Sequence, residues 1–123
     1  MYIEIDFNSD EAIYMQLRNQ IVQGIATNQY QEGESLPSVR RLAESIGINM
    51  HTVNKAYHVL RQEGFIRLDR RNGAVIFLEE DKSQAVRELQ ETLQVILAKA
   101  VCKNISREEI HQLTDAILDE YEF

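Results

Sequence analysis

The amino-acid sequence is short of several features, and each shortage excludes a class of protein. Its 123 residues include one cysteine, Cys102, which cannot form a disulfide within the chain and therefore fits a reducing compartment. No apolar run approaches the roughly 18 residues that a membrane-spanning helix needs. The first residues lack the basic stretch and following apolar stretch of a signal peptide. We therefore expect a cytoplasmic protein without a membrane partner.

The sequence also lacks the residue patterns of metal sites and enzymes. His51 and His58 are seven residues apart, His111 is distant, and neither a His-Glu-x-x-His motif nor a cysteine pair accompanies them. Nucleophile motifs, phosphate-binding glycine loops and cofactor fingerprints are missing as well. We therefore predict that the protein is not an enzyme and binds neither a metal nor a cofactor. Cys102 is expected to be a small core residue near a helix end.

Positive charge is scarce overall but concentrated in one segment. The chain holds 13 Lys and Arg against 20 Asp and Glu, a net charge of −7, which taken alone argues against nucleic-acid binding. Residues 40–71, however, hold seven bases and three acids, a net charge of +4. The flanks carry −5 over residues 1–39 and −6 over residues 79–123. This distribution predicts one positive face directed at an anionic partner.

The N-terminal third of the chain predicts an extended segment followed by a helix. Apolar residues alternate with polar ones at the start, which indicates a short extended segment with one buried face: Ile3, Ile5 and Phe7. Ser9 or Asp10 is placed to cap a helix, which is expected to end near Asn28. Its buried positions recur every four residues at Ile13, Leu17, Ile21 and Ile25.

Two short helices joined by a glycine turn come next. The only proline, Pro37, is expected in the first turn of the first helix, and Asn49 is expected to cap the second. Ala43, Gly47 and Val53 are separated by four and six residues, which is the spacing of a helix-turn-helix. In that motif the first residue must be small, the second needs a positive φ, and the third locks the second helix onto the first. An ordinary helical hairpin is the alternative.

A hairpin with a basic tip follows the second helix. Residues 65–68 and 74–78 favour strands, and Asn72-Gly73 between them predicts a tight turn in which both residues take a positive φ. The tip then carries Arg70 and Arg71. A hairpin in this place turns the motif into a winged helix-turn-helix, and the wing residues Arg70, Arg71, Asn72 and Gly73 suit a minor groove or phosphates.

The second helix of a helix-turn-helix enters the major groove, so its outward face predicts DNA contacts. Asn54 suits bidentate pairing with adenine, Thr52 can bond a phosphate or a base, and Lys55 can reach a phosphate or a guanine. The full set of candidates in this part of the chain is Asn49, Met50, His51, Thr52, Asn54, Lys55 and His58.

Arg40 and Arg41 open the preceding helix, whose positive end also favours a phosphate. One of them can instead form a surface ion pair with Glu44, which would contribute little.

Residues 13–78 resemble the N-terminal domain of the GntR family of bacterial transcription regulators. The resemblance lies in residues 13–17 (IYMQL), 33–43 (GESLPSVRRLA), 47–57 (GINMHTVNKAY) and 63–66 (EGFI). It implies that the residues matching Arg40, Thr52 and the wing contact DNA. The chain departs from the family pattern at Met50, where proline is usual, and at Arg71, where glycine is usual. These changes are expected to alter the preferred operator and the backbone contact of the wing.

The remaining 45 or so residues predict two helices with a wide apolar stripe. Ser106 opens the second of them with a capping-box pattern. Two helices cannot enclose a ligand pocket of ~300 Å³ on their own, and the tail resembles that of the YtrA subgroup, which serves dimerisation. A two-fold interface would bury the stripe, although packing onto the chain's own DNA-binding domain is the alternative. The predicted interface residues are Val86, Leu89, Leu93, Ile96, Leu97, Ala100, Ile110, Leu113, Ile117 and Tyr121.

Together these patterns predict a mainly α-helical protein with a small β-hairpin. A winged helix-turn-helix over residues 1–78 would bind double-stranded operator DNA, and residues 79–123 would form a homodimer. The resemblance implies a transcription regulator, with repression favoured over activation. Its target would be an operon, which in this subgroup often encodes a membrane transporter. A winged-helix module for protein–protein contacts remains the alternative. A small-molecule effector stays open, because no residue in the sequence identifies one.

Overall fold

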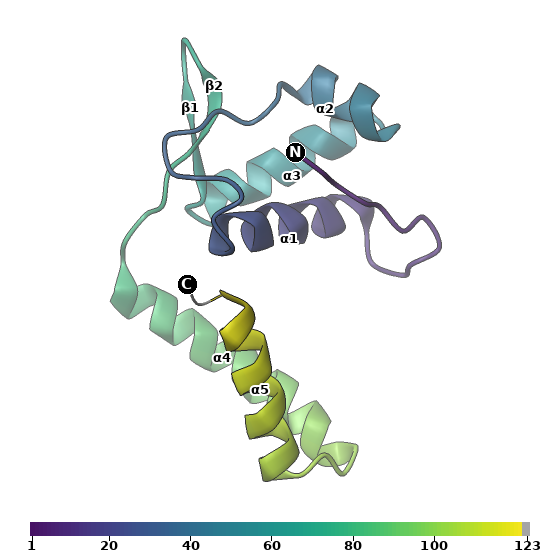
Figure 1. The fold of residues 1–123 in the computed structure, drawn as a ribbon, viewed down its shortest axis with the longest axis vertical. Helices are drawn as coiled ribbons and strands as arrows, with labels where there is room; N and C mark the ends of the chain where they lie inside the picture. The colour runs from purple at the N-terminus through teal and green to yellow at the C-terminus, as the bar shows by residue number, and fades with distance from the viewer. Residues whose placement is uncertain (122–123) are drawn as a thin grey trace. The chain divides into compact units, whose positions relative to one another are not determined.

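The computed structural model describes residues 1–121 and divides the chain after Glu79 into two compact units. The first unit contains the helices α1 (Ile13–Ala26), α2 (Val39–Ile46) and α3 (Met50–Gln62) and the strands β1 (Ile66–Asp69) and β2 (Gly73–Ile76) (Figure 1). The second contains α4 (Lys82–Cys102) and α5 (Arg107–Tyr121). The predicted fold, helices with one small hairpin, is confirmed. Among residues 1–121 no helix has the length and apolar character to cross a membrane.

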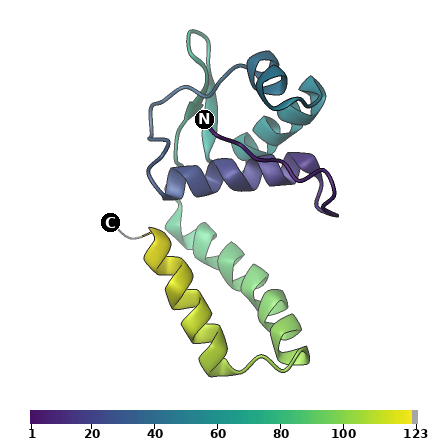
Figure 2. The same ribbon diagram turned by 45° about the vertical axis from the view of Figure 1, so that its right-hand side comes forward.

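The core of the first unit lies between its three helices and the hairpin. Leu17 and Ile21 of α1 and Val53 and Leu60 of α3 are fully buried, as the helical spacing predicts. Ile76 of β2 closes the core from the side of the hairpin, with 1% of its surface exposed. Packing of α1 against α3 therefore fixes the position of α3 (Figures 1 and 2).

The hairpin is joined by a third backbone segment. β1 and β2 pair antiparallel from Ile66↔Ile76 to Asp69↔Gly73. The residues before α2 run along the free edge of β2, where the Leu36 amide donates to the Ala74 carbonyl at 2.8 Å and the Ile76 amide donates to the Glu34 carbonyl at 2.9 Å. The hairpin and the start of α2 are therefore connected by backbone hydrogen bonds.

The start of α1 differs from the sequence-based expectation. The helix begins at Ile13, its N-cap Ala12 offers no side-chain bond, and the Ser9 hydroxyl accepts from the Glu11 amide instead. The cause is Gln16, which is 8% exposed. Its side-chain nitrogen donates to the carbonyls of Asp6 and Glu11 at 3.0 and 2.9 Å. These bonds hold residues 6–11 as a turn outside the helix.

The predicted inward face of the first residues is only partly right. Ile3 is buried and Ile5 is half-buried, but Phe7 is 63% exposed. The chain turns after Asp6, whose carbonyl accepts from the Ser9 amide at 3.3 Å. The alternation of an extended strand therefore ends before it reaches Phe7.

Pro37 lies just outside α2 rather than in its first turn. Ser38 is the N-cap, and its hydroxyl accepts from the Arg41 amide at 3.2 Å. The Pro37 carbonyl accepts a hydrogen bond of 2.7 Å from the hydroxyl of Tyr57 on α3. A serine side chain and a tyrosine from another helix thus fix the place where α2 begins.

The second unit is a pair of helices with uncovered apolar side chains. The predicted capping box is confirmed: the Glu109 amide donates to the Ser106 hydroxyl at 3.1 Å, and the Ser106 amide donates to the Glu109 carboxylate at 2.8 Å. None of the residues of α4 or α5 is buried. The prediction of Cys102 as a core residue is therefore wrong, since it lies exposed at the end of α4. A two-helix unit is too thin to enclose it.

Candidate nucleic-acid interface

The turn between α2 and α3 has the geometry that a helix-turn-helix requires. Gly47 takes a left-handed conformation with φ of 71° and its amide donates to the Ala43 carbonyl at 2.9 Å. Ala43 is 3% exposed where the helices cross, and Val53 is completely buried. All three predicted roles are confirmed. A side chain larger than that of Ala43 would push α3 away from α2.

The face of α3 opposite the core is exposed to solvent. Its buried side is Val53, Ala56, Tyr57 and Leu60, so the helical repeat turns the predicted contact residues outward. Of these, Thr52 is half-buried and the others are exposed: Met50, His51, Asn54, Lys55 and His58. The Asn49 carboxamide oxygen is engaged as the N-cap, since it accepts from the His51 amide at 2.7 Å.

Two arginines stand at the start of α2. Arg40 and Arg41 are both exposed beside the N-terminal end of the helix, where the backbone dipole favours an anion. The only ion pair among residues 1–121 joins Arg18 and Glu63 at 2.7 Å and involves neither Arg40 nor Arg41. The predicted alternative, an ion pair with Glu44, is therefore wrong, and both guanidinium groups are available for another anion.

The wing carries an exposed basic tip that is ordered by an aspartate. The Asp69 carboxylate accepts from the amides of Arg71 at 2.8 Å and Asn72 at 3.3 Å, and these two bonds hold its pKa below the ordinary value. The turn differs from the prediction in one respect: Gly73 has a φ of 70°, but Asn72 does not take a positive φ. Asp69 pairs with Gly73, so three residues form the loop, a connection that needs a single left-handed residue.

The side chain of Lys55, a predicted DNA contact, lies over an aromatic ring of another helix. The Lys55 ammonium of α3 lies 4.1 Å from the centre of the Tyr14 ring on α1, and the ring face attracts a cation. The sequence assigns Lys55 to a phosphate or a guanine and does not predict its contact with Tyr14. Neither residue carries a pattern that reveals a contact between two helices so far apart in the sequence.

A groove of about 320 Å³ lies among the start of α2, the outward face of α3 and the wing. Its lining includes Asn54, His58 and Arg61 of α3 together with Ser38 and Gly73. Sequence reasoning missed Arg61, although the spacing of four and three residues from Asn54 through His58 places all three on one helical face. The structure therefore brings the predicted contacts Asn54 and His58 of α3 and Gly73 of the wing around one cavity, whereas the predicted Arg40 and Arg41 of α2 do not line it.

The other predicted wing residues lie at the tip beyond this groove. Arg70, Arg71 and Asn72 are exposed. Arg67 is directed elsewhere, since its guanidinium lies 4.7 Å from the centre of the Phe77 ring. Among residues 1–121 no cluster of histidine, cysteine, aspartate or glutamate could hold a metal ion.

A helix-turn-helix with an exposed second helix and a basic wing defines the winged helix-turn-helix class of DNA-binding proteins. The family model of bacterial regulatory proteins, gntR family, matches residues 10–76. The chain is also 33% identical over 114 residues to the HTH-type transcriptional repressor YtrA of Bacillus subtilis (strain 168), covering 89% of this chain and 87% of that protein. The chain therefore belongs to the gntR family, and it is a DNA-binding transcription regulator rather than an enzyme.

Solved structures agree with this assignment. A transcriptional antiterminator from Listeria monocytogenes EGD-e superposes with a TM-score of 0.88 at 29% identity, covering 100% of this chain and 95% of that one. YtrA from Sulfolobus acidocaldarius, a GntR-family transcription factor, gives a TM-score of 0.68 at 38% identity, covering 81% and 97%. The chain is thus similar to YtrA-type regulators in both sequence and structure.

Proposed function

We propose that the protein is a repressor that binds a two-fold operator as a homodimer. The observation that carries the proposal is the groove among the start of α2, α3 and the wing, which is lined by the exposed side chains of Asn54, His58 and Arg61. Each subunit inserts α3 into a major groove, and the two insertions lie ~34 Å apart or a multiple of that distance. The YtrA repressor of Bacillus subtilis supports repression.

The side chains divide into two roles at this surface. Asn54 projects from the exposed face of α3 and pairs with a base, whereas Arg40 at the start of α2 binds a phosphate. Arg70 and Arg71 at the wing tip enter a minor groove or bind phosphates. Arg61 and His58, which line the groove, add phosphate contacts.

The second unit supplies the dimer interface. Its predicted apolar stripe is exposed in the single chain, with Leu89 at 58%, Ile96 at 53% and Leu113 at 62%. Fully burying one such side chain contributes about 1.5–3 kcal/mol. Two helices that cannot bury these residues within one chain gain most by covering them with the same face of a second copy. We assign dimerisation to residues 79–123 and DNA binding to residues 1–78.

The resemblance to the YtrA subgroup extends the proposal to the target, an operon that encodes a membrane transporter. A repressor of such an operon acts on the chromosome and hence in the bacterial cytoplasm.

Fluorescence anisotropy with DNA from the protein's own promoter region tests the proposal. Arg40→Ala should weaken binding to many sequences and lower the slope of log affinity against log salt by about 0.9 for each phosphate that it leaves without a cation. Asn54→Ala should mostly relax the preference for operator over unrelated DNA. Arg87→Ala on α4 removes the same charge at a residue to which no DNA contact is assigned and serves as the control. A salt-independent response of the unmodified protein would refute DNA recognition and indicate a protein-binding module.

Sedimentation tests the dimer separately. Leu89→Glu places a charge in the stripe of α4 and should convert the dimer to a monomer at micromolar concentration, because a buried unpaired charge is very unfavourable. Gln90→Glu adds the same charge at the next position of α4 and should leave the dimer intact. An unmodified chain that sediments as a monomer at micromolar concentration would overturn the assignment.

A further inference from the structure

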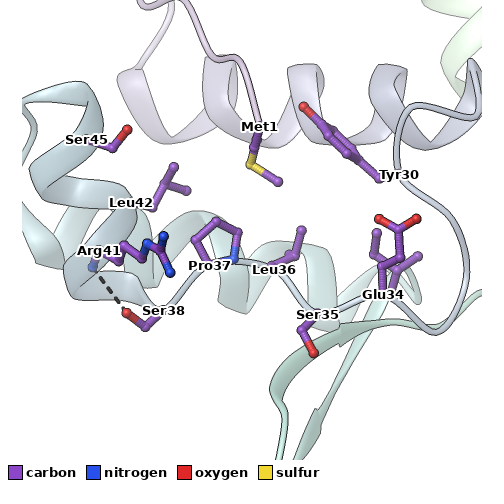
Figure 3. Close-up of a pocket in the computed structure, with 11 residues that line it drawn as sticks. Met1, Tyr30, Glu34, Ser35, Leu36, Pro37, Ser38, Arg41, Leu42 and Ser45 are labelled. Atoms are coloured by element: carbon purple, nitrogen blue, oxygen red, sulfur yellow. Dashed lines mark hydrogen bonds between the residues drawn. The ribbon is translucent and has the colours of Figure 1, made fainter.

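A second and larger cavity lies on the other side of the start of α2. It has a volume of about 630 Å³, within the range of ~300–1,000 Å³ of small-molecule sites. Figure 3 shows Tyr30 on one side of this space and Leu36 and Pro37 on the other, with the side chain of Met1 between them and Leu42 near one end. Its walls are therefore apolar along the middle, and all of them belong to the first unit.

The two ends of the cavity carry opposite charges. Arg41 lies at one end beside Ser38, and Glu34 lies at the other (Figure 3). Neither Arg41 nor Glu34 forms an ion pair within residues 1–121, because the only ion pair there joins Arg18 and Glu63. A guanidinium recognises a carboxylate, and a carboxylate accepts hydrogen bonds from an ammonium group. The cavity thus presents a cation, an apolar middle and an anion in sequence.

We propose that this cavity binds a small zwitterion with opposite charges at its two ends and an apolar middle, which is the chemistry of a short free peptide. The carboxylate of the ligand lies against Arg41 and its ammonium against Glu34. Its apolar middle lies between the ring of Tyr30 and the side chain of Leu36.

The position of the cavity links this ligand to DNA binding. Pro37 and Ser38 line both this cavity and the groove that faces DNA, so the start of α2 is the wall between them. The preceding residues are bonded to β2, where the Leu36 amide donates to Ala74. A bound ligand also engages Arg41, next to Arg40. It therefore acts on the start of α2 and on the base of the wing at once.

The expected effect is a loss of DNA affinity. A ligand carboxylate on Arg41 occupies the positive end of α2, which a DNA phosphate needs, and this step rests on the proposed roles of Arg40 and Arg41. Because coupling between two ligands is reciprocal, DNA must weaken the ligand by the same factor. The zwitterion is then an inducer that releases the repressor.

Ligand binding is measured first, without DNA. The tripeptide Ala-Leu-Ala is titrated to about 10 mM into the full chain while NMR signals are followed. The methyl groups of Leu36, Leu42 and Ile76 and the ring of Tyr30 should shift. N-acetyl and C-terminal amide forms should each bind about fivefold more weakly, because each loses one exposed ion pair. Absence of shifts at these residues, or blocked peptides that bind as tightly as Ala-Leu-Ala, would overturn the site.

Charge variants of the chain sharpen this test. Glu34→Gln should weaken Ala-Leu-Ala about fivefold and leave the N-acetylated peptide unaffected, so that the two bind alike. Glu32→Gln removes an equal charge two residues before Glu34, and the Glu32 side chain does not line the cavity. This control should change the affinity for neither peptide. Equal effects of the two substitutions would show that the overall charge, not the cavity, attracts the peptide.

The link to DNA is measured by anisotropy on promoter DNA with increasing tripeptide. Release of DNA by the tripeptide that needs about fivefold more peptide in Glu34→Gln supports the coupling. Peptide-induced NMR shifts with unchanged DNA affinity would refute it while leaving the binding site in place. A chain that binds peptide but never binds DNA would instead refute the proposed operator function.

Discussion

Gly24, in the last turn of α1, lies against a ring that reverses the usual effect of an alanine substitution. A Cβ placed there would lie 2.5 Å from Cδ2 of Tyr30 and still closer to Cε2. The ring cannot easily move along the chain, because the amides of Gln29 and Tyr30 both donate to the Gly24 carbonyl, at 2.8 and 3.2 Å. Gly24→Ala should therefore expel the Tyr30 ring from α1.

Two opposing terms set the size of this effect. Alanine is favoured over glycine in a helix by up to about 1 kcal/mol. Expelling the half-buried ring of Tyr30 loses part of the 1.5–3 kcal/mol of a buried aromatic side chain, about 2 kcal/mol. Gly24→Ala should thus destabilise the protein by about 1 kcal/mol. In a Tyr30→Ala background the same change should stabilise it by about 1 kcal/mol, which gives a coupling of about 2 kcal/mol.

Urea unfolding of the four proteins, followed by circular dichroism, measures this coupling. All four must be compared at one protein concentration, since dimerisation makes the stability depend on it. Stabilisation by Gly24→Ala in both backgrounds would show that the Tyr30 ring does not lie on Gly24.

Two further predictions concern tyrosines that hold the DNA-binding elements. Tyr57→Phe leaves the Pro37 carbonyl without its 2.7 Å hydrogen bond and should lower the free energy of unfolding by about 1–2 kcal/mol. The control Tyr2→Phe, at a residue that is 82% exposed, should leave it unchanged. Equal urea midpoints of the two variants would contradict the role of this hydrogen bond. Tyr14→Leu frees the Lys55 ammonium from its ring and should weaken DNA binding two- to fivefold, or about 0.5–1 kcal/mol. In a double-mutant cycle with Lys55→Met, additive losses would show that Tyr14 does not act through Lys55.

The helix-turn-helix could be predicted from sequence because the local backbone or packing restricts the type of each key residue. Gly47 takes a backbone angle that other residues avoid, Ala43 lies where two helices cross, and Val53 lies on a regular apolar face. Such constraints leave a mark on residue type and spacing. The same holds for the capping box of Ser106 and Glu109.

The features that sequence reasoning missed depend on contacts between distant segments. Gln16 is polar, so a search for apolar spacing passes over it, yet it is buried by bonds to the backbone of Asp6 and Glu11. The Lys55 ammonium contacts the Tyr14 ring because α1 packs against α3 in the folded chain. Opposite charges at the two ends of the larger cavity arise in the same way, from the folding of the segment before α2 around Leu42.

The turn at the wing tip also sets how a sample of this protein ages. Asn72 is followed by Gly73, and both are exposed. Because glycine has no side chain to hinder it, its amide nitrogen can attack the asparagine carboxamide, release ammonia and form a succinimide, which water opens to aspartate or isoaspartate. Each event adds a negative charge beside Arg71 at the surface proposed to meet phosphates. Old preparations should therefore contain an acidic subpopulation that elutes later from an anion exchanger and has a lower affinity for DNA.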